Sequence, residues 1–375
     1  MYRINTLNKI SATGLAVLPE GFEVGEFAEP DALLVRSAQV DAAALPASVL
    51  AIGRAGAGVN NIPVPECTSK GIAVFNTPGA NANAVKELAV CALLLASRRI
   101  VAGAGWCRTL ASEGDNFAKA VEKGKSQFAG PEIAGKTLGV VGLGAIGVLV
   151  ANAAAGLGME IVGYDPFLSE KNRAALCSGA KLVDDINELF AASDYITLHC
   201  PLLDSTKNTV CAESLAKCRD GVRIVNLARG GLVDTGALIG AVKTGKCAAY
   251  VTDFAAVEML GVDGITVLPH LGASTPESEE NCAVMAAEEI SGYLLYGSVV
   301  NSVNLPALEL GRPENRRLTA ISTSDVSALG EKLGAVKTAS ASRGGVFYTA
   351  FELDTAEGAL EAAEGFPGVV KARLI

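Results

Sequence analysis

The chain contains 375 residues, 50% of them apolar and 19% charged, and its formal net charge is −9. This length exceeds one ordinary hydrophobic core, so we expect two or three α/β domains, and the acidic charge excludes an extended nucleic-acid interface. The nine cysteines include no Cys-x-x-Cys pair and no Cys/His cluster, which excludes a disulfide framework or a metal site and favours the cytoplasm. The first ten residues lack the apolar core of a secretion signal.

Short β-rich runs alternate with turns in the first hundred residues, which is typical of a parallel sheet. The runs are ALLVRSA, VLAIGRAG and GIAVFNTPG, at residues 32–38, 49–56 and 71–79. One long helix is predicted over residues 81–100, with Asn81 or Asn83 as its N-cap and two arginines near its end. We expect this helix to bridge two domains.

Six further β-rich runs lie between residues 136 and 271, and each ends in a polar, glycine or proline turn. They are KTLGVVGLG, EIVGYDP, YITLHCP, RIVNLARG, AYVTDF and ITVLPH. This alternation predicts a doubly wound sheet of six strands, in which ligands bind at the carboxyl ends of the strands. Residues 137–159 carry no charge, but their six glycines disfavour a membrane-spanning helix. We therefore expect no membrane partner.

The last hundred residues predict a helix, a strand and a separate small module. Acidic residues open the helical segment 276–296, and VVNSVNLP at 299–306 predicts a last strand that returns to the first domain. The segments after GRPENRR follow the order βαββαβ, which is typical of a ferredoxin-like module. The predicted domains are therefore residues 1–98 completed by 284–307, residues 99–283, and residues 317–375.

The segment GLGAIG at residues 142–147 matches the Gly-x-Gly-x-x-Gly pattern between a predicted strand and a predicted helix. Gly142 permits the tight turn, Gly144 lets a pyrophosphate approach the backbone, and Gly147 lets the helix pack closely on its strand. Asp165 follows Gly142 by 23 residues, close to the separation of about 20 at which an acid binds the adenosine ribose. Its carboxylate would repel a 2′-phosphate, which favours NAD over NADP. The alternative is a structural turn in which Asp165 caps a loop.

Three predicted strand ends beyond this turn carry side chains suited to hydride transfer from an alcohol. Such a reaction needs a base for the hydroxyl proton and a cation for an adjacent carboxylate. LPHLGAST offers His270 as the base, NLARGG offers Arg229 as the cation, and VTDFAAVE offers Glu258 to fix the tautomer of His270. Each residue alone also fits a structural or surface role, so the prediction depends on their joint order.

Motifs across roughly residues 30–305 resemble the D-isomer-specific 2-hydroxyacid dehydrogenases; they include GRAGAGVNN, FNTPGANANAVKEL, GKTLGVVGLGAIG, HCPLLDST, VNLARGGLVD and PHLGAST. The resemblance implies two doubly wound, Rossmann-like domains, with an NAD-binding domain inserted in a substrate-binding domain. It implies a catalytic set of Arg229, Glu258 and His270, while His199 matches a segment beside the cofactor. The positions implied to contact NAD are Gly142, Gly144, Ala145, Ile146, Gly147, Asp165, Cys200, Leu227, Ala228, Asp253, Gly272 and Ala273.

Within this family the chain is most similar to members that oxidise D-3-phosphoglycerate to 3-phosphohydroxypyruvate, the first step of serine synthesis. Arg36 and Arg54 match positions that face the phosphorylated substrate, together with Arg229 and His270, and the loop from Asn76 to Asn81 would close on its carboxylate side. The substrate carries about three negative charges near pH 7, so an acidic protein must gather several arginines around it. The alternative for Arg36 and Arg54 is an ordinary surface role.

Two departures from the family pattern bear on these expectations. Glu258 precedes Met259 where the family usually has proline, so its loop would be shaped differently. The C-terminal module resembles an ACT-type regulatory domain, yet its turn STSDVSALG lacks the Asn-x-Pro-Gly of effector-binding examples, which argues against feedback by serine.

Two alternative functions stay open. One is another D-2-hydroxyacid dehydrogenase, such as a hydroxypyruvate/glyoxylate reductase or a D-lactate dehydrogenase. The other is a non-enzymatic, NAD-sensing scaffold. In either case a homodimer or homotetramer is expected, with the predicted helix 97–120 and its Trp106 as a contact face.

Overall fold

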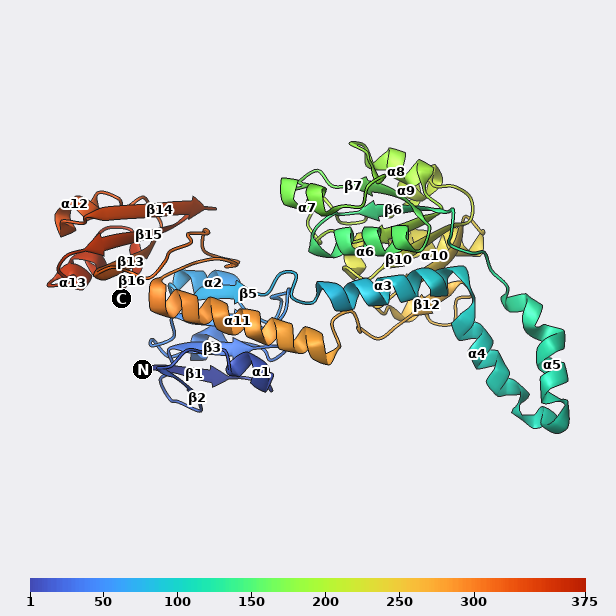
Figure 1. Ribbon diagram of the computed structural model, residues 1–375, viewed down its shortest axis with the longest axis horizontal. Coiled ribbons are helices and arrows are strands. Elements are labelled where there is room, and N and C mark those ends of the chain that lie inside the picture. Colours follow the sequence, from blue (N-terminus) through green and yellow to red (C-terminus); the bar gives the residue numbers. More distant parts are fainter. The chain divides into compact units, whose positions relative to one another are not determined.

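The computed structural model describes residues 1–375, which form two compact units. The first unit comprises Met1–Asn81 and Thr275–Ile375, and the second comprises Ala82–Ser274 (Figure 1). The chain therefore leaves the first unit once and returns to it. The crossings lie after residues 81 and 274, not after 98 and 283 as expected from the sequence. The difference arises because helix α3 (Ala82–Ser97) packs in the core of the second unit, whereas helix α11 (Pro276–Tyr296) packs in that of the first.

The first unit is built on a parallel sheet of five strands in the order β2-β1-β3-β4-β5. Its strands are β1 (Tyr2–Thr6), β2 (Phe22–Gly25), β3 (Ala32–Val35), β4 (Ala51–Arg54) and β5 (Ala73–Asn76). The short elements beside it are α1 (Ala12–Leu15), η1 (Ala42–Ala44) and α2 (Val64–Ser69). Strands β1 and β2 were missed from the sequence because they lack an apolar run; only one of their nine positions, Ile4, is fully buried.

Helix α11 covers one face of this sheet. Its buried side contributes Ala283, Ala286 and Ile290 to a core that also contains residues of β1, β3, β4 and β5. Gly14 of α1 makes this packing possible, because an added Cβ would lie 2.3 Å from the Cβ of Ala283.

The second unit contains seven parallel strands in the order β12-β11-β10-β9-β6-β7-β8. The strands are β6 (Thr137–Val141), β7 (Glu160–Tyr164), β8 (Lys181–Leu182), β9 (Tyr195–Leu198), β10 (Val222–Asn226), β11 (Cys247–Thr252) and β12 (Ile265–Val267). The prediction of a parallel α/β sheet is confirmed, but the number of strands is wrong by one. Strand β8 has two residues and is too short to leave a pattern in the sequence.

Helices cover both faces of the seven-stranded sheet. Consecutive residues of one strand enter opposite cores, as Val140 and Val141 do. The core that contains Val140 includes α3 and α6 (Ala145–Gly156), and the opposite core includes α8 (Ile186–Ala192), α9 (Ala212–Lys217) and α10 (Thr235–Lys243). The remaining short elements are α7 (Glu170–Ala175), η4 (Gly230–Leu232) and η5 (Val257–Met259).

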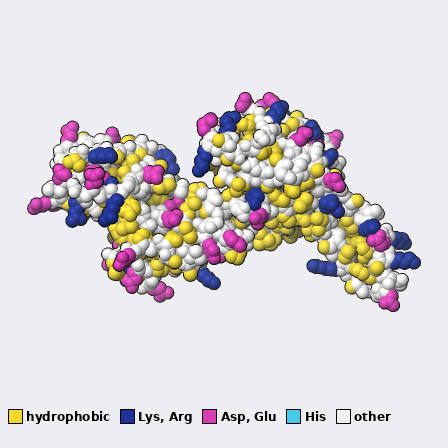
Figure 2. Space-filling view, in the orientation of Figure 1, with side chains coloured by type: hydrophobic (Ala, Val, Ile, Leu, Met, Phe, Trp, Pro, Cys, Tyr) yellow, Lys and Arg dark blue, Asp and Glu magenta, His cyan; other side chains and the backbone are white.

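A helical arm extends from the second unit between α3 and β6 (Figure 1). The single helix predicted at 97–120 is wrong, since α4 (Ile100–Thr109) and α5 (Phe117–Gly124) are separated by a 3-10 segment in which Gly114 has φ 53°. Neither helix has a buried residue, and Figure 2 shows Lys and Arg side chains beside hydrophobic ones on this arm. Trp106 packs on Phe128, with ring centroids 5.2 Å apart.

No single helix is long and apolar enough to cross a bilayer; Ala82–Ser97 and Ile100–Phe128 meet that test only as a pair bent by 65°.

The C-terminal module confirms the predicted βαββαβ order. Its antiparallel sheet has the order β14-β15-β13-β16. The elements are β13 (Arg316–Ser322), α12 (Leu329–Leu333), β14 (Lys337–Arg343), β15 (Val346–Leu353), α13 (Ala359–Glu364) and β16 (Val369–Leu374). The module caps the C-terminal carbonyls of α11, because Tyr348 donates to Gly297 O (2.7 Å) and Arg373 donates to Tyr293 O (2.6 Å).

The strand predicted at 299–306 is wrong, because this segment forms only isolated bridges. Side chains replace part of the expected ladder. Asn304 accepts a hydrogen bond from the N–H of Val74 (2.8 Å) and donates to Ile72 O (2.9 Å), and Ser302 donates to Val74 O (3.0 Å). The edge of β5 is thus satisfied without a regular strand.

Candidate active site

The glycine turn lies between the end of β6 and the start of α6 in the second unit. Gly142 has φ +91°, and an added Cβ there would lie 2.8 Å from the backbone N of Cys200. At Gly147 an added Cβ would lie 1.9 Å from Gly142 O, so the helix starts in direct contact with the turn. At Gly144, the N-cap of α6, an added Cβ would meet nothing within 4 Å. Two of the glycines therefore serve packing, and Gly144 leaves open space at the helix N-terminus.

Asp165, at the end of β7, ties this turn to the next one. Its Oδ2 accepts the N–H of Leu143 (2.8 Å), and its Oδ1 accepts the N–H of Phe167 (2.8 Å). The loop-capping role considered in the sequence analysis is therefore present. Each carboxylate oxygen has a second lone pair, so Asp165 can also accept hydrogen bonds from hydroxyl groups of a ligand.

A pocket of about 630 Å³ opens beside the glycine turn, and more of its lining is apolar than polar. The residues on the turn side include Gly142, Gly144, Asp165, Phe167, His199 and Cys200. His199 shares a hydrogen bond of 2.9 Å with the hydroxyl of Thr197, and desolvation by burial lowers the pKa of His199 to about 4. Its ring is therefore neutral at pH 7, which fits a wall of a binding pocket better than a proton-transfer role.

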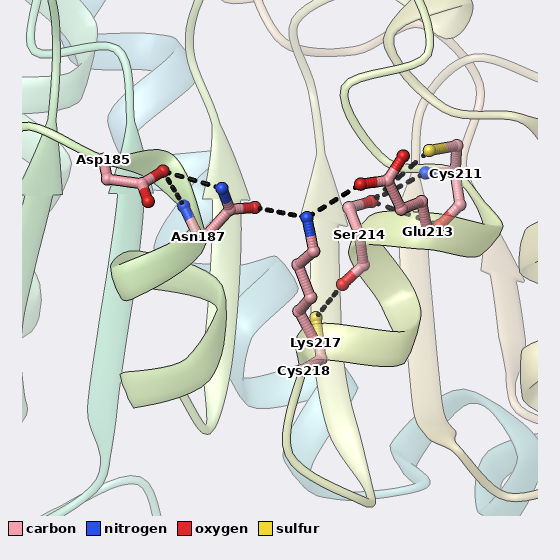
Figure 3. Close-up of polar contacts among 7 residues, drawn as sticks. All are labelled: Asp185, Asn187, Cys211, Glu213, Ser214, Lys217 and Cys218. Atoms are coloured by element: carbon pink, nitrogen blue, oxygen red, sulfur yellow. Dashed lines mark hydrogen bonds and ion pairs between the residues drawn. The ribbon is translucent and has the colours of Figure 1, made fainter.

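The opposite wall is a polar network between α8 and α9 (Figure 3). Lys217 donates to Asn187 Oδ1 (3.0 Å) and to Glu213 Oε1 (2.8 Å), and Asn187 donates through its backbone and side chain to Asp185 (2.9 and 2.8 Å). The bond to Lys217 lowers the pKa of Glu213, and the bond to Glu213 raises the pKa of Lys217. The i,i+4 spacing of Glu213 and Lys217 was visible in the sequence. The bridge from Lys217 to Asn187 was not, because the two residues lie 30 positions apart.

A second pocket, of about 550 Å³, lies where β11 and β12 end. His270, Asp253 and Phe254 line it together with Gly230 and Gly231, so the structure brings these predicted strand ends to one place. The ring of Phe254 lies 4.9 Å from that of His270, measured between centroids. The pocket beside the glycine turn and the exposed imidazole of His270 thus both lie at the carboxyl edge of the same sheet.

Asp253 is the buried acid of this second pocket, with 2% of its surface exposed. Its Oδ2 accepts the N–H of Gly272 (3.1 Å), which joins the turns after β11 and β12. Its Oδ1 is buried and has no partner, so one acceptor remains for a ligand. Burial raises the pKa of Asp253, opposed by the hydrogen bond from Gly272 and by the nearby imidazole of His270.

Arg229 is partly buried, and no ion pair engages it. Buried Asn226 shapes its loop by donating to Arg229 O (2.9 Å) and accepting the N–H of Ala228 (3.1 Å). The guanidinium donates one bond, to Ala228 O (2.6 Å). Its other N–H groups are available to an anion.

The position of Glu258 differs from the one predicted, in which it orients His270. It is exposed, and no hydrogen bond or ion pair joins it to His270. The 3-10 turn η5 buries Met259 at 4% exposure and thereby turns Val257 and Glu258 outward. Met259, at the position where the resemblance expected proline, therefore orients this turn by entering the core.

The other predicted contact residues of the second unit lie on the same edge of the sheet. Ala145 and Ile146 open α6, and Gly272 and Ala273 follow His270. Cys200 lines the first pocket, where burial raises the pKa of its thiol. Leu227 is 6% exposed, so its side chain serves the core.

The three predicted substrate residues of the first unit lie at the carboxyl ends of its strands. Arg54 ends β4, paired in register with Val35, and its Nε donates to Arg36 O (3.0 Å). The guanidinium of Arg36 forms an ion pair of 2.8 Å with Glu279, a partner that the sequence analysis missed. In the loop after β5, Asn81 Oδ1 is buried without a partner.

The chain is similar in sequence to known dehydrogenases. Residues 90–272 match the family described as D-isomer specific 2-hydroxyacid dehydrogenase, NAD binding domain. The D-3-phosphoglycerate dehydrogenase of Methanocaldococcus jannaschii is 40% identical over 270 residues, which cover 70% of this chain and 49% of that protein. The D-3-phosphoglycerate dehydrogenase of Synechocystis sp. is 39% identical over 289 residues, covering 75% and 50%. This chain thus spans about half the length of these relatives.

Solved structures agree with these matches. The glyoxylate reductase from Paecilomyes thermophila aligns with a TM-score of 0.66 and 28% identity, covering 80% of this chain and 98% of that one. The NAD⁺-bound 3-phosphoglycerate dehydrogenase of Entamoeba histolytica aligns with a TM-score of 0.61 and 29% identity, covering 81% and 98%.

Proposed function

We propose, from its membership of the D-isomer-specific 2-hydroxyacid dehydrogenases through residues 90–272, that this chain oxidises D-3-phosphoglycerate to 3-phosphohydroxypyruvate with NAD. One observation carries the proposal: the open glycine turn and the pocket of His270 and Asp253 occupy the carboxyl edge of one parallel sheet. Relatives of about 40% identity named D-3-phosphoglycerate dehydrogenase support the choice of substrate.

The residues around the glycine turn fit NAD. The open space at Gly144 and the N-terminus of α6 would hold the pyrophosphate, and Asp165 would accept hydrogen bonds from the ribose. The unpartnered Oδ1 of Asp253 would accept a bond from the amide of the nicotinamide. When bound, NAD supplies the acceptor for the hydride of the substrate.

The chain's own residues would move the proton and hold the substrate. His270 takes the proton of the C2 hydroxyl, and Arg229 binds the carboxylate and polarises the forming carbonyl. Glu258 is proposed to orient the second ring nitrogen of His270. That bond requires a movement of the exposed turn η5, because none exists in this structure.

Arg36 and Arg54 are proposed to bind the phosphorylated side of the substrate, and the loop from Asn76 to Asn81 is proposed to close on its carboxylate side. A phosphate with nearly two charges needs such planar, always-charged donors. The buried, unpartnered Oδ1 of Asn81 gives that loop an acceptor for a substrate hydroxyl.

The proposal is tested by steady-state oxidation of D-3-phosphoglycerate with NAD, comparing the wild type with His270→Ala. Loss of a general base predicts a fall in kcat of at least about 100-fold, with NADH binding retained. Ser274→Ala is the matched control, because this residue lies on the same loop and its hydroxyl bonds only the backbone of His270. A fall in kcat of less than about tenfold in His270→Ala would contradict the assigned base.

The structural similarity to a glyoxylate reductase favours a second candidate, reduction of glyoxylate or hydroxypyruvate. The two reactions differ in the charge of their substrates, because only one substrate carries a phosphate. Comparing kcat/KM for 3-phosphohydroxypyruvate, hydroxypyruvate, glyoxylate and pyruvate with NADH decides between them. Preference for an unphosphorylated acid would replace the main proposal, and tight NADH binding without any turnover would favour the scaffold.

We also propose that the C-terminal βαββαβ module is ACT-like and that the chain forms a cytoplasmic homodimer or homotetramer. The nine free cysteines support a reducing compartment. The exposed Ile100, Val101 and Phe117 of the helical arm support a contact between copies of the chain.

A further inference from the structure

We infer that Glu279 is a specificity-determining residue that occupies Arg36 in place of an anionic substrate. The inference rests on the proposed function, since it refines how the arginines of the first unit select their anion. Glu279 acts as an internal anion that a substrate phosphate must displace.

The ion pair joins two segments of the first unit whose backbones are held by hydrogen bonds. Arg36 follows β3, and Asn8 Oδ1 holds its loop by accepting the N–H groups of Arg36, Ser37 and Ala38 at 3.2, 3.2 and 2.9 Å. Glu279 lies in the first turn of the 21-residue helix α11, where its N–H donates to Thr275 O (3.0 Å). Both backbones are thus fixed, and the 2.8 Å contact depends on the two side chains alone.

The surroundings identify Arg36 as part of an anion-binding edge. Arg54 extends from the neighbouring strand, and its Nε binds the carbonyl of Arg36. An added Cβ at Gly56 would lie 1.9 Å from Nη1 of Arg54, so the head of Arg54 lies directly over this glycine. The two guanidinium groups therefore come from adjacent strand ends, and Glu279 forms its ion pair with that of Arg36.

Solvent exposure makes the ion pair easy to exchange. The side chains of Arg36 and Glu279 are 39% and 44% exposed, so screening keeps their attraction weak. A phosphate with nearly two charges and three oxygens competes with Glu279 for Arg36, whereas an acid without a phosphate places no anion there, because its carboxylate is assigned to Arg229. Glu279 therefore weakens the binding of phosphorylated acids and leaves the binding of unphosphorylated acids unchanged.

The experiment compares Glu279→Gln with Glu280→Gln, an exposed neighbour that makes no ion pair. Both variants change the net charge equally, so general electrostatic effects cancel. Glu279→Gln is expected to lower the KM for D-3-phosphoglycerate about two- to fivefold, with kcat unchanged, since an exposed pair contributes little. The KM for unphosphorylated acids should stay unchanged, because they place no group on Arg36. In an Arg36→Gln background the effect of Glu279→Gln should vanish.

Titration with inorganic phosphate tests the inference without turnover. Glu279→Gln should bind phosphate two- to fivefold more tightly than the wild type and Glu280→Gln. Equal KM and phosphate affinity in the two variants, or an effect that persists with Arg36→Gln, would overturn the inference. Wild-type protein that does not oxidise D-3-phosphoglycerate would instead refute the proposed function, while the phosphate titration would still decide the role of Glu279.

Discussion

The carboxyl edges of the two parallel sheets are built from different chemical groups. At the edge of the second unit, glycines expose backbone N–H groups, and a single carboxylate, Asp165, fastens the turn. At the edge of the first unit, the exposed groups are long charged side chains, and Arg36 already has a partner in Glu279. A site made of backbone depends on close packing, whereas a site made of side chains depends on competing charges.

The largest effect is predicted for a substitution that disrupts the glycine turn of the second unit. Gly147→Ala places a Cβ 1.9 Å from Gly142 O, so the start of α6 must shift. We expect a loss of stability of about 3 kcal/mol and loss of NADH binding, measured by urea unfolding and fluorescence titration.

The control for that prediction is Gly144→Ala, where an added Cβ meets nothing within 4 Å. It should retain stability to within about 1 kcal/mol while still weakening NADH binding, because the pyrophosphate needs that space. Equal stabilities of the two variants would refute the packing argument.

The second prediction concerns a buried carboxyl group of the first unit. Glu289 of α11 is 8% exposed, and its Oε1 accepts a bond from Asn301 (2.6 Å) while its Oε2 has no partner. Burial, with a smaller effect from Glu288, raises the pKa of Glu289 from 4.5 to about 8. Between these values the folded chain holds a proton that the unfolded chain has lost. The free energy of unfolding should therefore fall as pH rises from 4.5 to 8 and level off above it.

Glu289→Gln should remove this dependence. Relative to the wild type it should gain roughly 3 kcal/mol between pH 5 and pH 8, measured by urea unfolding at several pH values. Glu280→Gln, at an exposed position of the same helix that does not affect the pKa of Glu289, should keep the wild-type slope. Parallel pH profiles for the wild type and Glu289→Gln would show that the carboxyl is not protonated at neutral pH.

The smallest effect is predicted for Asp165, whose carboxylate carries the negative charge at the glycine turn. Asp165→Asn keeps one of the two bonds to Leu143 and Phe167 and removes the negative charge. The KM for NAD should rise roughly tenfold, the cost of one charge-assisted hydrogen bond, and discrimination against NADP should weaken. Asp184→Asn, an exposed acid without a partner, is the control for net charge. An unchanged ratio of KM for NAD and NADP would contradict the assignment.

Local patterns in the sequence predicted much of the second unit. The glycine turn, its strand and helix, and the strand ends at Asp253 and His270 follow from short-range spacing. Errors occurred where distant segments decide the structure. The edge of β5 is closed by side chains of residues more than 220 positions away, so 299–306 forms no strand. The orientation of the turn that carries Glu258 is set by the burial of Met259. The arm bends at Gly114 because this residue has a positive φ, which the neighbouring sequence does not predict.

The sequence by itself determined the α/β class, the Gly142 turn with Asp165, and which residue types supply a base and a guanidinium. These features depend on the periodicity of hydrophobic residues and on the chemistry of single side chains, both of which can be read from short stretches of sequence. Only the tertiary structure decided that Glu279 pairs with Arg36 and that Lys217 bridges to Asn187. Such contacts are set by the packing of helices on sheets, which brings residues tens to hundreds of positions apart within hydrogen-bonding distance.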